Sequence, residues 1–596
     1  MAGYNAPIMD MRFALDELAG LPELAALPQW EAAAPDAVGA ILDEAGKFAA
    51  EVIAPINQSG DAEGARLENG VVRSPAGFKQ AYRQFAEGGW NGLPFDPAYG
   101  GQGLPWAVSA AVSEMWQAAN LSFGLYPLLT QGAIDLLLHH GSADQKRTFV
   151  PRLIDGSWNG TMNLTEPQAG SDLGALRTRA QRANGHYRIS GQKIFITNGE
   201  TDLSENVVHM VLARLGDAPQ GVKGISLFIV PKFLVRDDGS LGERNDLRAV
   251  SLEHKLGIRA SPTCVMSYGD DGGAVGYLVG EENRGLDYMF TMMNNARLSV
   301  GIQGVGIAER AYQQAREFAR SRIQSRELGG DHGSVAIIRH PDVRRMLMTM
   351  KAQTEAARAL TYYAAGALDR ARALPDAAAR TRALGIAELL IPVAKAWSTD
   401  IGFAVADMGV QVHGGMGFIE ETGAAQHLRD ARITQIYEGT NGIQANDLLA
   451  RKLVRDRGAV AAGFIADMRQ AAERLSGVPG PASTAIRSRL LAALDDIERA
   501  TTWLVATWRD DPRRAAAGAT PYLRMVGIVV GGWTMAIAAL AAHRRMRRRE
   551  DDAAFLEAKL VTARFYAENI LPQAGALLTA IVDGGDTVLA LSDERF

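Results

Sequence analysis

The sequence is poor in cysteine and lacks the short motifs of several enzyme classes. Its single cysteine, Cys264, excludes an intramolecular disulfide and any metal site built from several cysteines. The chain has no His-Glu-x-x-His run, Gly-x-Ser-x-Gly elbow or Walker loop. Metal-assisted hydrolysis, acyl-serine chemistry and P-loop nucleotide binding therefore have no basis in the sequence. We expect no metal site.

An excess of charge of one sign is also missing. The chain has 62 Lys and Arg against 67 Asp and Glu, a formal charge of −5. This balance does not favour binding to a polyanion over the whole surface, so a nucleic-acid role would need a local basic patch. With 47% hydrophobic and 22% charged residues, the composition is that of a soluble globular protein of about four folding units.

The amino terminus does not have the pattern of a secretory signal. Met1 to Leu27 opens without a basic region and carries Asp10, Asp16 and Glu17 among apolar residues. Together with the single cysteine, which suits a reducing compartment, this pattern predicts a cytoplasmic protein.

One apolar run, Val526 to Ala542, is followed at once by a basic run, His543 to Arg549. A membrane anchor with a positive flank and a buried bundle helix with a solvated end both fit this pattern. Because the run is shorter than the roughly 20 residues that a bilayer needs, it favours the buried helix and disfavours membrane association.

The spacing of apolar residues changes twice along the chain, from helical to β-rich and back to helical. We expect separate strands at His186 to Ser190 and Lys193 to Thr197, and a first bundle helix from Leu286 to Arg326. The sequence thus predicts a mainly α protein with a central β domain. The expected domains are residues 1–158 (helical), 159–283 (β), 284–456 (four-helix) and 457–596 (an extra helical domain, with a break at Pro479-Gly480-Pro481).

Four segments are candidates for chemistry. The loop Thr165 to Asp172 can present hydroxyls and backbone N–H groups to an anion or a polar ring, and the strand Lys193 to Gly199 follows it. The glycine-rich loop Gln411 to Phe418 permits a backbone to approach a pyrophosphate closely. Glu438, directly before Gly439, suits a base whose pKa is raised by burial. Taken singly, each segment also fits an ordinary connector, a core strand or a solvated helix end.

Taken in order, these segments resemble the acyl-CoA dehydrogenase flavoprotein family over roughly Asp36 to Arg455. The resemblance implies a helical domain, a β-barrel domain and a four-helix domain, with FAD as the cofactor. It also implies a homo-oligomer, a dimer being favoured, because the loop matching Gln411 reaches the FAD of a neighbouring subunit. The opening Tyr4 to Phe13 and the extra carboxy-terminal domain resemble the longer bacterial members, which include 3-(methylthio)propanoyl-CoA dehydrogenases.

The resemblance also assigns roles to residues. Glu438 matches the catalytic base, and the position that carries the base in some members is Ala296 here. Ser325 stands where an aromatic residue is usual near the FAD adenine. The residues that match FAD contacts are Thr165, Ser171, Phe195, Thr197, Arg322, Gln411, Gly414, Gly415 and Thr440. Those that match contacts to the acyl-CoA are Ser171, Asn294, Arg297 and Gly439.

The reaction that the resemblance implies is α,β-dehydrogenation of an acyl-CoA thioester, with an electron-transfer flavoprotein as the acceptor. The substrate is open between 3-(methylthio)propanoyl-CoA and a general saturated acyl-CoA. A DNA-binding flavoprotein of the same fold is a further alternative, motivated by Arg544, Arg545 and Arg547 to Arg549 but opposed by the net acidity and by the presence of Glu438.

Overall fold

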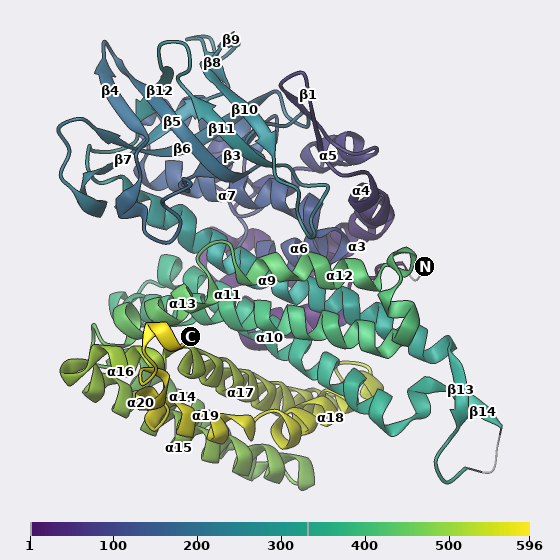
Figure 1. Ribbon diagram of the computed structural model, residues 1–596. Helices are drawn as coiled ribbons and strands as arrows, with labels where there is room; N and C mark the ends of the chain where they lie inside the picture. Colours follow the sequence, from purple (N-terminus) through teal and green to yellow (C-terminus); the bar gives the residue numbers. More distant parts are fainter. Residues whose placement is uncertain (1–2, 331–332) are drawn as a thin grey trace. The chain divides into compact units, whose positions relative to one another are not determined.

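The computed structural model describes residues 3–330 and 333–596, which form two compact units. Unit 1 comprises Met1–Gly46, Pro105–Ala118 and Val300–Phe596, and unit 2 comprises Lys47–Leu104 and Ala119–Ser299. Helices make up most of unit 1, which also contains a short β-hairpin, whereas unit 2 combines helices with a large sheet (Figure 1). This is the expected fold class, a mainly α protein with a central β-barrel and an additional helical region at the carboxy terminus.

Unit 2 is built on an eight-stranded, mostly antiparallel barrel. The strand order is β10-β11-β5-β12-β7-β6-β3, and β4 pairs with both β5 and β6; the β3–β6 and β4–β6 pairs are parallel. Helices α4, α5, α7 and α8 precede it in the chain. The bounds are α4 Asn57–Glu63, α5 Phe78–Glu87, α7 Leu121–His140, α8 Ala143–Ile154, β3 Trp158–Asn163, β4 Arg179–Ala183, β5 His186–Thr197, β6 Asn206–Leu215, β7 Ile225–Pro231, β10 Leu247–Leu252, β11 Thr263–Tyr268 and β12 Ala274–Leu278, with the short strands β1 Arg66–Glu68, β2 Val71–Arg73, β8 Phe233–Val235 and β9 Leu241–Arg244.

The interior of the barrel is apolar, with Phe228, Val230 and Met266 among its buried side chains. Cys264 lies in the same cluster, and burial raises the pKa of its thiol to about 12, so it stays protonated at neutral pH. The two strands expected between His186 and Thr197 are a single strand, β5. The expectation was wrong because Gly191 marks a close approach rather than a turn: a Cβ there would lie 2.9 Å from the Cα of Thr178.

Unit 1 contains a bundle of long helices. They include α9 Gly285–Ser321, whose first part belongs to unit 2, α10 Pro341–Ala373 and α11 Ala377–His413. The helix expected to reach Arg326 ends at Ser321, because the chain then forms a hairpin of β13 (Ile323–Arg326) and β14 (Ser334–Ala336). Further helices of unit 1 are α1 Ile8–Ala14, α2 Leu21–Ala25, α6 Trp106–Ala119, α12 Ala424–Ala431 and α13 Asn441–Asp447. Helix α3 Pro35–Phe48 extends across the boundary between the units.

Glycines allow the bundle helices to pack closely. A Cβ on Gly301 would lie 2.7 Å from the carbonyl oxygen of Ala394, and a Cβ on Gly304 would lie 2.3 Å from that of Ser398. These glycines are therefore helix-packing residues.

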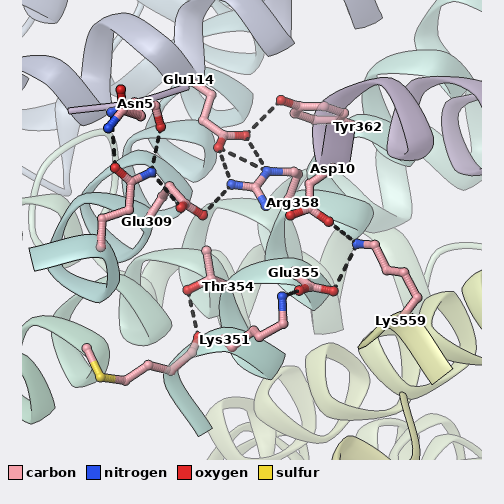
Figure 2. Close-up of polar contacts among 12 residues, drawn as sticks. Asn5, Asp10, Glu114, Glu309, Lys351, Thr354, Glu355, Arg358, Tyr362 and Lys559 are labelled. Carbon is pink, nitrogen blue, oxygen red and sulfur yellow. Dashed lines mark hydrogen bonds and ion pairs between the residues drawn. The ribbon is translucent and has the colours of Figure 1, made fainter. Parts of the chain in front are cut away.

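A buried ion cluster ties α6, α9 and α10 together (Figure 2). Arg358 donates hydrogen bonds to Glu114 at 2.6 Å and to Glu309 at 2.7 Å, and the Tyr362 hydroxyl donates to Glu114 at 2.8 Å. All four side chains are buried. Because an unpaired charge is costly in the interior, loss of any one partner would destabilise this part of the bundle.

The carboxy-terminal helices pack on the bundle and on the amino-terminal segment. Lys559 pairs with Glu355 at 2.9 Å and with Asp10, as Figure 2 shows, and Arg545 pairs with Glu17 at 2.7 Å. The bounds are α14 Ala459–Arg474, α15 Pro481–Asp510, α16 Pro512–Ala517, α17 Ala519–Arg548, α18 Ala553–Asn569, α19 Gln573–Val582 and α20 Gly585–Val588. The break expected at Pro479 to Pro481 separates α14 from α15.

The apolar run Val526 to Ala542 lies within α17. Among the described residues, α7, Ala377–Phe418 and α17 are long and apolar enough to cross a membrane, but 89% of the apolar window of α17 is buried within the protein. The short length of this run favoured a buried helix, and the structure shows one. The basic end of α17 is partly neutralised, because Arg544 and Arg545 both contact Glu17.

Two buried histidines predict a pH dependence of stability. Burial lowers the pKa of His209, in the barrel, and of His427, in α12, to about 3. Unfolded histidines titrate near 6.5, so the unfolded state binds more protons between pH 6.5 and 3, and the free energy of unfolding falls as the pH falls through this range.

We expect His209→Gln to reduce this acid sensitivity. Each buried neutral histidine lowers the free energy of unfolding by up to about 1.4 kcal/mol per pH unit below 6.5. Glutamine can still meet the Tyr268 hydroxyl, which lies 3.0 Å from Nδ1 of His209. Urea denaturation of both proteins between pH 7 and 4.5 measures the difference, and equal pH dependence would contradict the assignment.

Candidate active site

The candidate residues of unit 2 include a loop and a strand that are joined by hydrogen bonds. The loop carrying Thr165 and Ser171 runs along the end of β5, where the backbone N–H of Ile194 donates to the carbonyl of Thr165 at 2.9 Å. The hydroxyl of Thr161 donates to the carbonyl of Thr197 at 2.6 Å. The structure thus brings Thr165 beside the strand that carries Phe195 and Thr197.

Phe195 has an unusual backbone for an aromatic residue. Its φ is 59°, in the left-handed region, and the register between β5 and β11 shifts across this position. The bulge turns the ring outward, so that 59% of Phe195 is exposed. A core role, which the isolated motif also fitted, is therefore wrong. An exposed aromatic ring on a strained strand end is a surface for a flat ligand.

Asn294 and Arg297 form a second pair in unit 2, on the first part of α9. The guanidinium of Arg297 donates to the amide oxygen of Asn294 at 3.3 Å, as the i, i+3 spacing on a helix allows. Arg297 is buried and Asn294 half-buried. Ala296, the alternative position for the base, is buried and has no proton acceptor on its side chain.

Glu438, in unit 1, also has a left-handed backbone. Its φ is 58° and that of Gly439 is 80°, so two consecutive residues adopt a conformation that side chains disfavour. The side chain of Gln444 secures this turn by donating to the carbonyl oxygens of Glu438 at 3.0 Å and Gly439 at 3.4 Å. Thr440 then caps α13 by accepting from the N–H of Ile443. The half-buried Glu438 is therefore held by its neighbours and not at a frayed helix end.

Asn441 anchors the same turn to α11. Buried Lys395 donates to its amide oxygen at 2.8 Å, while its amide nitrogen donates to Asp400 at 2.8 Å and to the carbonyl of Ala396 at 3.1 Å. Burial raises the pKa of Asp400 despite its hydrogen bonds. Asn441 thus fixes the start of α13 against α11.

Gln411, Gly414, Gly415 and Arg322 lie at one end of the bundle. The rings of Phe318 on α9 and His413 on α11 stack with centroids 4.4 Å apart, so the carboxy-terminal ends of these two helices are neighbours. Gly414 has a φ of 60°, and a Cβ on Gly414 or Gly415 would meet nothing within 4 Å. The arrangement exposes glycine backbone next to a helix end that carries an arginine.

Comparisons with known proteins show to which protein family the chain belongs. Profiles of acyl-CoA dehydrogenase domains match residues 36–157 (N-terminal domain), 161–270 (middle domain) and 283–453 (C-terminal domain), and an acetyl-CoA dehydrogenase C-terminal-like profile matches 464–592. A 3-methylmercaptopropionyl-CoA dehydrogenase of Ruegeria pomeroyi is 51% identical over 99% of this chain and 100% of its own length. The chain belongs to the acyl-CoA dehydrogenase family.

A second sequence relative and a solved structure also match this chain. A butyryl-CoA dehydrogenase of Syntrophomonas wolfei is 34% identical over 100% of this chain and 99% of its own length. A solved acyl-CoA dehydrogenase of Bacillus anthracis, complexed with FAD, shares the fold with a TM-score of 0.72 at 22% identity, covering 94% of this chain and 89% of its own. The family, the fold, the oxidoreductase class and FAD as the cofactor are thus confirmed, whereas the roles of single residues and the domain boundaries stay predictions.

The residues of this acyl-CoA dehydrogenase fit FAD chemically. Unit 2 offers the outward ring of Phe195 and the hydroxyls of Thr165 and Thr197 to a flat, polar ring system. Unit 1 offers the open backbone at Gly414 and the positive charge of Arg322 to phosphates.

Sequence reasoning missed the side chains that hold both candidate loops. Lys193 and Lys395 are each fully buried, and each donates to the loop beside it, at Leu164 and Asn441 respectively. For Lys395 the available signal was its place in the apolar run Leu389 to Trp397, because a buried ammonium requires hydrogen-bonding partners. Lys193 follows Gly191 and Gln192, so no such signal was present there. The identity of those partners depends on tertiary structure.

We expect Asn441→Ala to slow catalysis by moving the Glu438 turn. Loss of the amide leaves Lys395 and Asp400 without one partner each and removes the link between α13 and α11. A shift of about 1 Å in a catalytic group can cost roughly 100-fold in rate. Anaerobic stopped-flow measurement of flavin reduction by an acyl-CoA should show a fall of about 10- to 100-fold with FAD still bound.

The matched control is Asn446→Ala, which removes an exposed asparagine from the same helix. It should reduce flavin at the wild-type rate. Equal rates for Asn441→Ala and Asn446→Ala would show that Asn441 does not position the base.

Proposed function

We propose that Glu438 is the base of an acyl-CoA α,β-dehydrogenation that yields a trans-2-enoyl-CoA. The α-carbon beside a thioester is a weak acid, and its proton leaves only if negative charge on the thioester oxygen is stabilised by donors such as backbone N–H groups. Glu438 takes this proton, and its carboxylate is carried on a turn that Gln444 and Asn441 keep rigid. When bound, FAD supplies the acceptor for the hydride from the β-carbon.

The observation that carries this proposal is the pair of left-handed residues Glu438 and Gly439, secured by the Gln444 side chain. Strained backbone of this kind persists only where surrounding contacts enforce it, and it gathers at functional sites. The position matches the base of the family to which the chain belongs. The other proposed contacts are Thr165, Ser171, Phe195, Thr197, Arg322, Gln411, Gly414, Gly415 and Thr440 for FAD, and Ser171, Asn294, Arg297 and Gly439 for the acyl-CoA.

We expect Glu438→Gln to abolish flavin bleaching by an acyl-CoA while FAD stays bound. Glutamine keeps the size of the side chain but cannot accept the proton, and a general base contributes roughly 100- to 10,000-fold to rate. Glu317→Gln, at an exposed glutamate of α9 that pairs with Arg320, serves as the matched control and should bleach normally. Bleaching by Glu438→Gln at the wild-type rate would refute the base assignment.

The proposed substrate is 3-(methylthio)propanoyl-CoA. Its support is the 51% identity to the Ruegeria pomeroyi dehydrogenase over the full length of both chains. The rival substrate class is a general saturated acyl-CoA, supported by the butyryl-CoA dehydrogenase at 34% identity. A pocket separates chain lengths by only about 1–3 kcal/mol per methylene, so the preference must be measured.

Anaerobic titration with a panel of thioesters distinguishes the two substrate classes. The panel contains methylthiopropanoyl-, butanoyl-, octanoyl-, palmitoyl- and phenylpropanoyl-CoA, and the rate of flavin reduction is measured for each. We expect the methylthiopropanoyl thioester to give the highest efficiency, by about tenfold or more over butanoyl-CoA. A higher efficiency for octanoyl- or palmitoyl-CoA would establish the rival.

The remaining parts of the proposal concern partners and location. We propose an electron-transfer flavoprotein as the acceptor, a homodimer as the assembly, and the cytoplasm as the location. Nucleic acid and membranes are not proposed partners, which is consistent with the ion pairs of Arg544 and Arg545 and with the burial of α17. The mass in solution tests the dimer, and reduction of the acceptor flavoprotein tests the electron partner.

A further inference from the structure

A buried ion pair lies under the candidate flavin loop of unit 2. The ammonium of Lys193 on β5 donates to a carboxylate oxygen of Glu166 at 2.9 Å and to the carbonyl oxygen of Leu164 at 2.9 Å. Side-chain exposure is 0% for Lys193 and 3% for Glu166. Neither side chain is accessible to a ligand, so any effect on FAD must pass through the loop.

Glu166 collects several donors from both sides of the loop. Besides Lys193, its carboxylate accepts from the hydroxyl of Thr178 at 2.6 Å, the backbone N–H groups of Thr178 at 3.0 Å and Arg177 at 2.6 Å, and the side chain of Gln168 at 2.7 Å. Five donors on one carboxylate leave it little freedom to move. Burial acts to raise the pKa of Glu166, but Lys193 and these hydrogen bonds outweigh it and lower the pKa to about 2.

The backbone of the loop closes over the same pair. Glu166 and Ala169 exchange backbone hydrogen bonds, at 3.0 Å from the N–H of Glu166 and 2.9 Å from that of Ala169. Leu164 is held by Lys193, and Thr165 by the N–H of Ile194. Residues 164–169 are therefore fixed at both ends, and the buried charges lie at the centre of the contacts that fix them.

We propose that Glu166 and Lys193 are positioning residues that set the loop carrying Thr165 and Ser171 in its FAD-binding conformation before the cofactor arrives. A buried ion pair is poor evidence of stabilisation, since apolar replacements of the pair are often neutral or better. Its value is in specifying one loop conformation, which lowers the entropy lost on binding. This inference rests on the proposed role of Thr165 and Ser171 as FAD contacts.

The test is the double variant Glu166→Gln/Lys193→Met in the full chain. It removes both charges together, so neither is left buried alone. The control, Glu355→Gln/Lys559→Met, removes another buried glutamate–lysine pair, on α10 and α18 (Figure 2), far from the loop in sequence. The opposite charges of Asp10 and Lys351, which also pair with these two residues, remain there together. FAD affinity is measured by titrating apoprotein, and hydrogen exchange of apoprotein reports the amides of Glu166, Ala169, Arg177 and Thr178.

We expect the Glu166→Gln/Lys193→Met protein to bind FAD about tenfold more weakly or worse and to lose amide protection in the loop. The Glu355→Gln/Lys559→Met protein should bind FAD with the wild-type Kd. Wild-type affinity and protection in the Glu166→Gln/Lys193→Met variant would overturn the inference. A wild-type protein that binds no FAD would instead refute the proposed function, and the exchange of the loop amides would still decide whether the pair sets the loop.

Thr178→Val provides a variant with minimal disturbance in case the double variant does not fold. It removes the 2.6 Å hydrogen bond to Glu166 and leaves the other four donors to that carboxylate in place. We expect faster exchange at Ala169 and weaker FAD binding, by about two- to fivefold, with a fall of no more than about a few degrees in the thermal midpoint. Unchanged exchange and unchanged FAD affinity together would contradict the positioning role.

Discussion

A buried lysine beneath each candidate loop is the constraint on which the proposed site depends. Lys193 lies in the core of unit 2 and Lys395 in that of unit 1, and neither has exposed surface. An ammonium group can be buried only if its protons are donated to acceptors. Lys193 donates to Leu164 and Glu166, and Lys395 donates to Asn441. A change in the conformation of either loop would therefore deprive a buried ammonium group of an acceptor, which costs free energy.

The rigid loops hold two candidate site residues in a strained backbone conformation. Phe195 and Glu438 are both non-glycine residues with φ near 60°, and each occupies a position predicted to act on the flavin or the substrate. Such a backbone is disfavoured by about 1–3 kcal/mol and relaxes unless neighbouring contacts prevent it. At Phe195 the bulge in the pairing of β5 with β11 prevents the backbone from relaxing. At Glu438 the hydrogen bond from the Gln444 side chain opposes such relaxation. The residues held in this way are the aromatic Phe195 in unit 2 and the carboxylate Glu438 in unit 1.

Much of the fold could be predicted from local pattern, because alternation and helical spacing are properties of neighbouring residues. The outer bounds of β5, His186 and Thr197, were predicted as observed, and so was the break between α14 and α15 at Pro479 to Pro481. The continuity of β5 through Gly191 could not be predicted, since a glycine that meets Thr178 across the sheet looks the same in sequence as a glycine in a turn. The hairpin after Ser321 was missed because the expected helix was extended through its first strand, Ile323–Arg326.

In the candidate site, only the residues that belong to sequence motifs could be predicted. Glu438 and the loop from Thr165 to Ser171 are recognisable in the sequence, but Gln444, Asn441 and Lys395 are ordinary helix residues until the fold brings them to the turn. The outward position of Phe195 likewise depends on a register shift between β5 and β11, which is a property of the pair of strands. Contacts of this kind are set by packing between distant segments, so no local pattern encodes them.

In the proposed reaction, the Glu438 carboxylate faces the α-carbon of a bound acyl thioester. A crystal structure of the protein with FAD and an unreactive acyl-CoA analogue measures this most directly. We expect a carboxylate oxygen about 3–3.5 Å from the α-carbon, with Phe195 and Thr197 beside the flavin. A carboxylate that points into solvent, or an α-carbon nearer to another base, would contradict it.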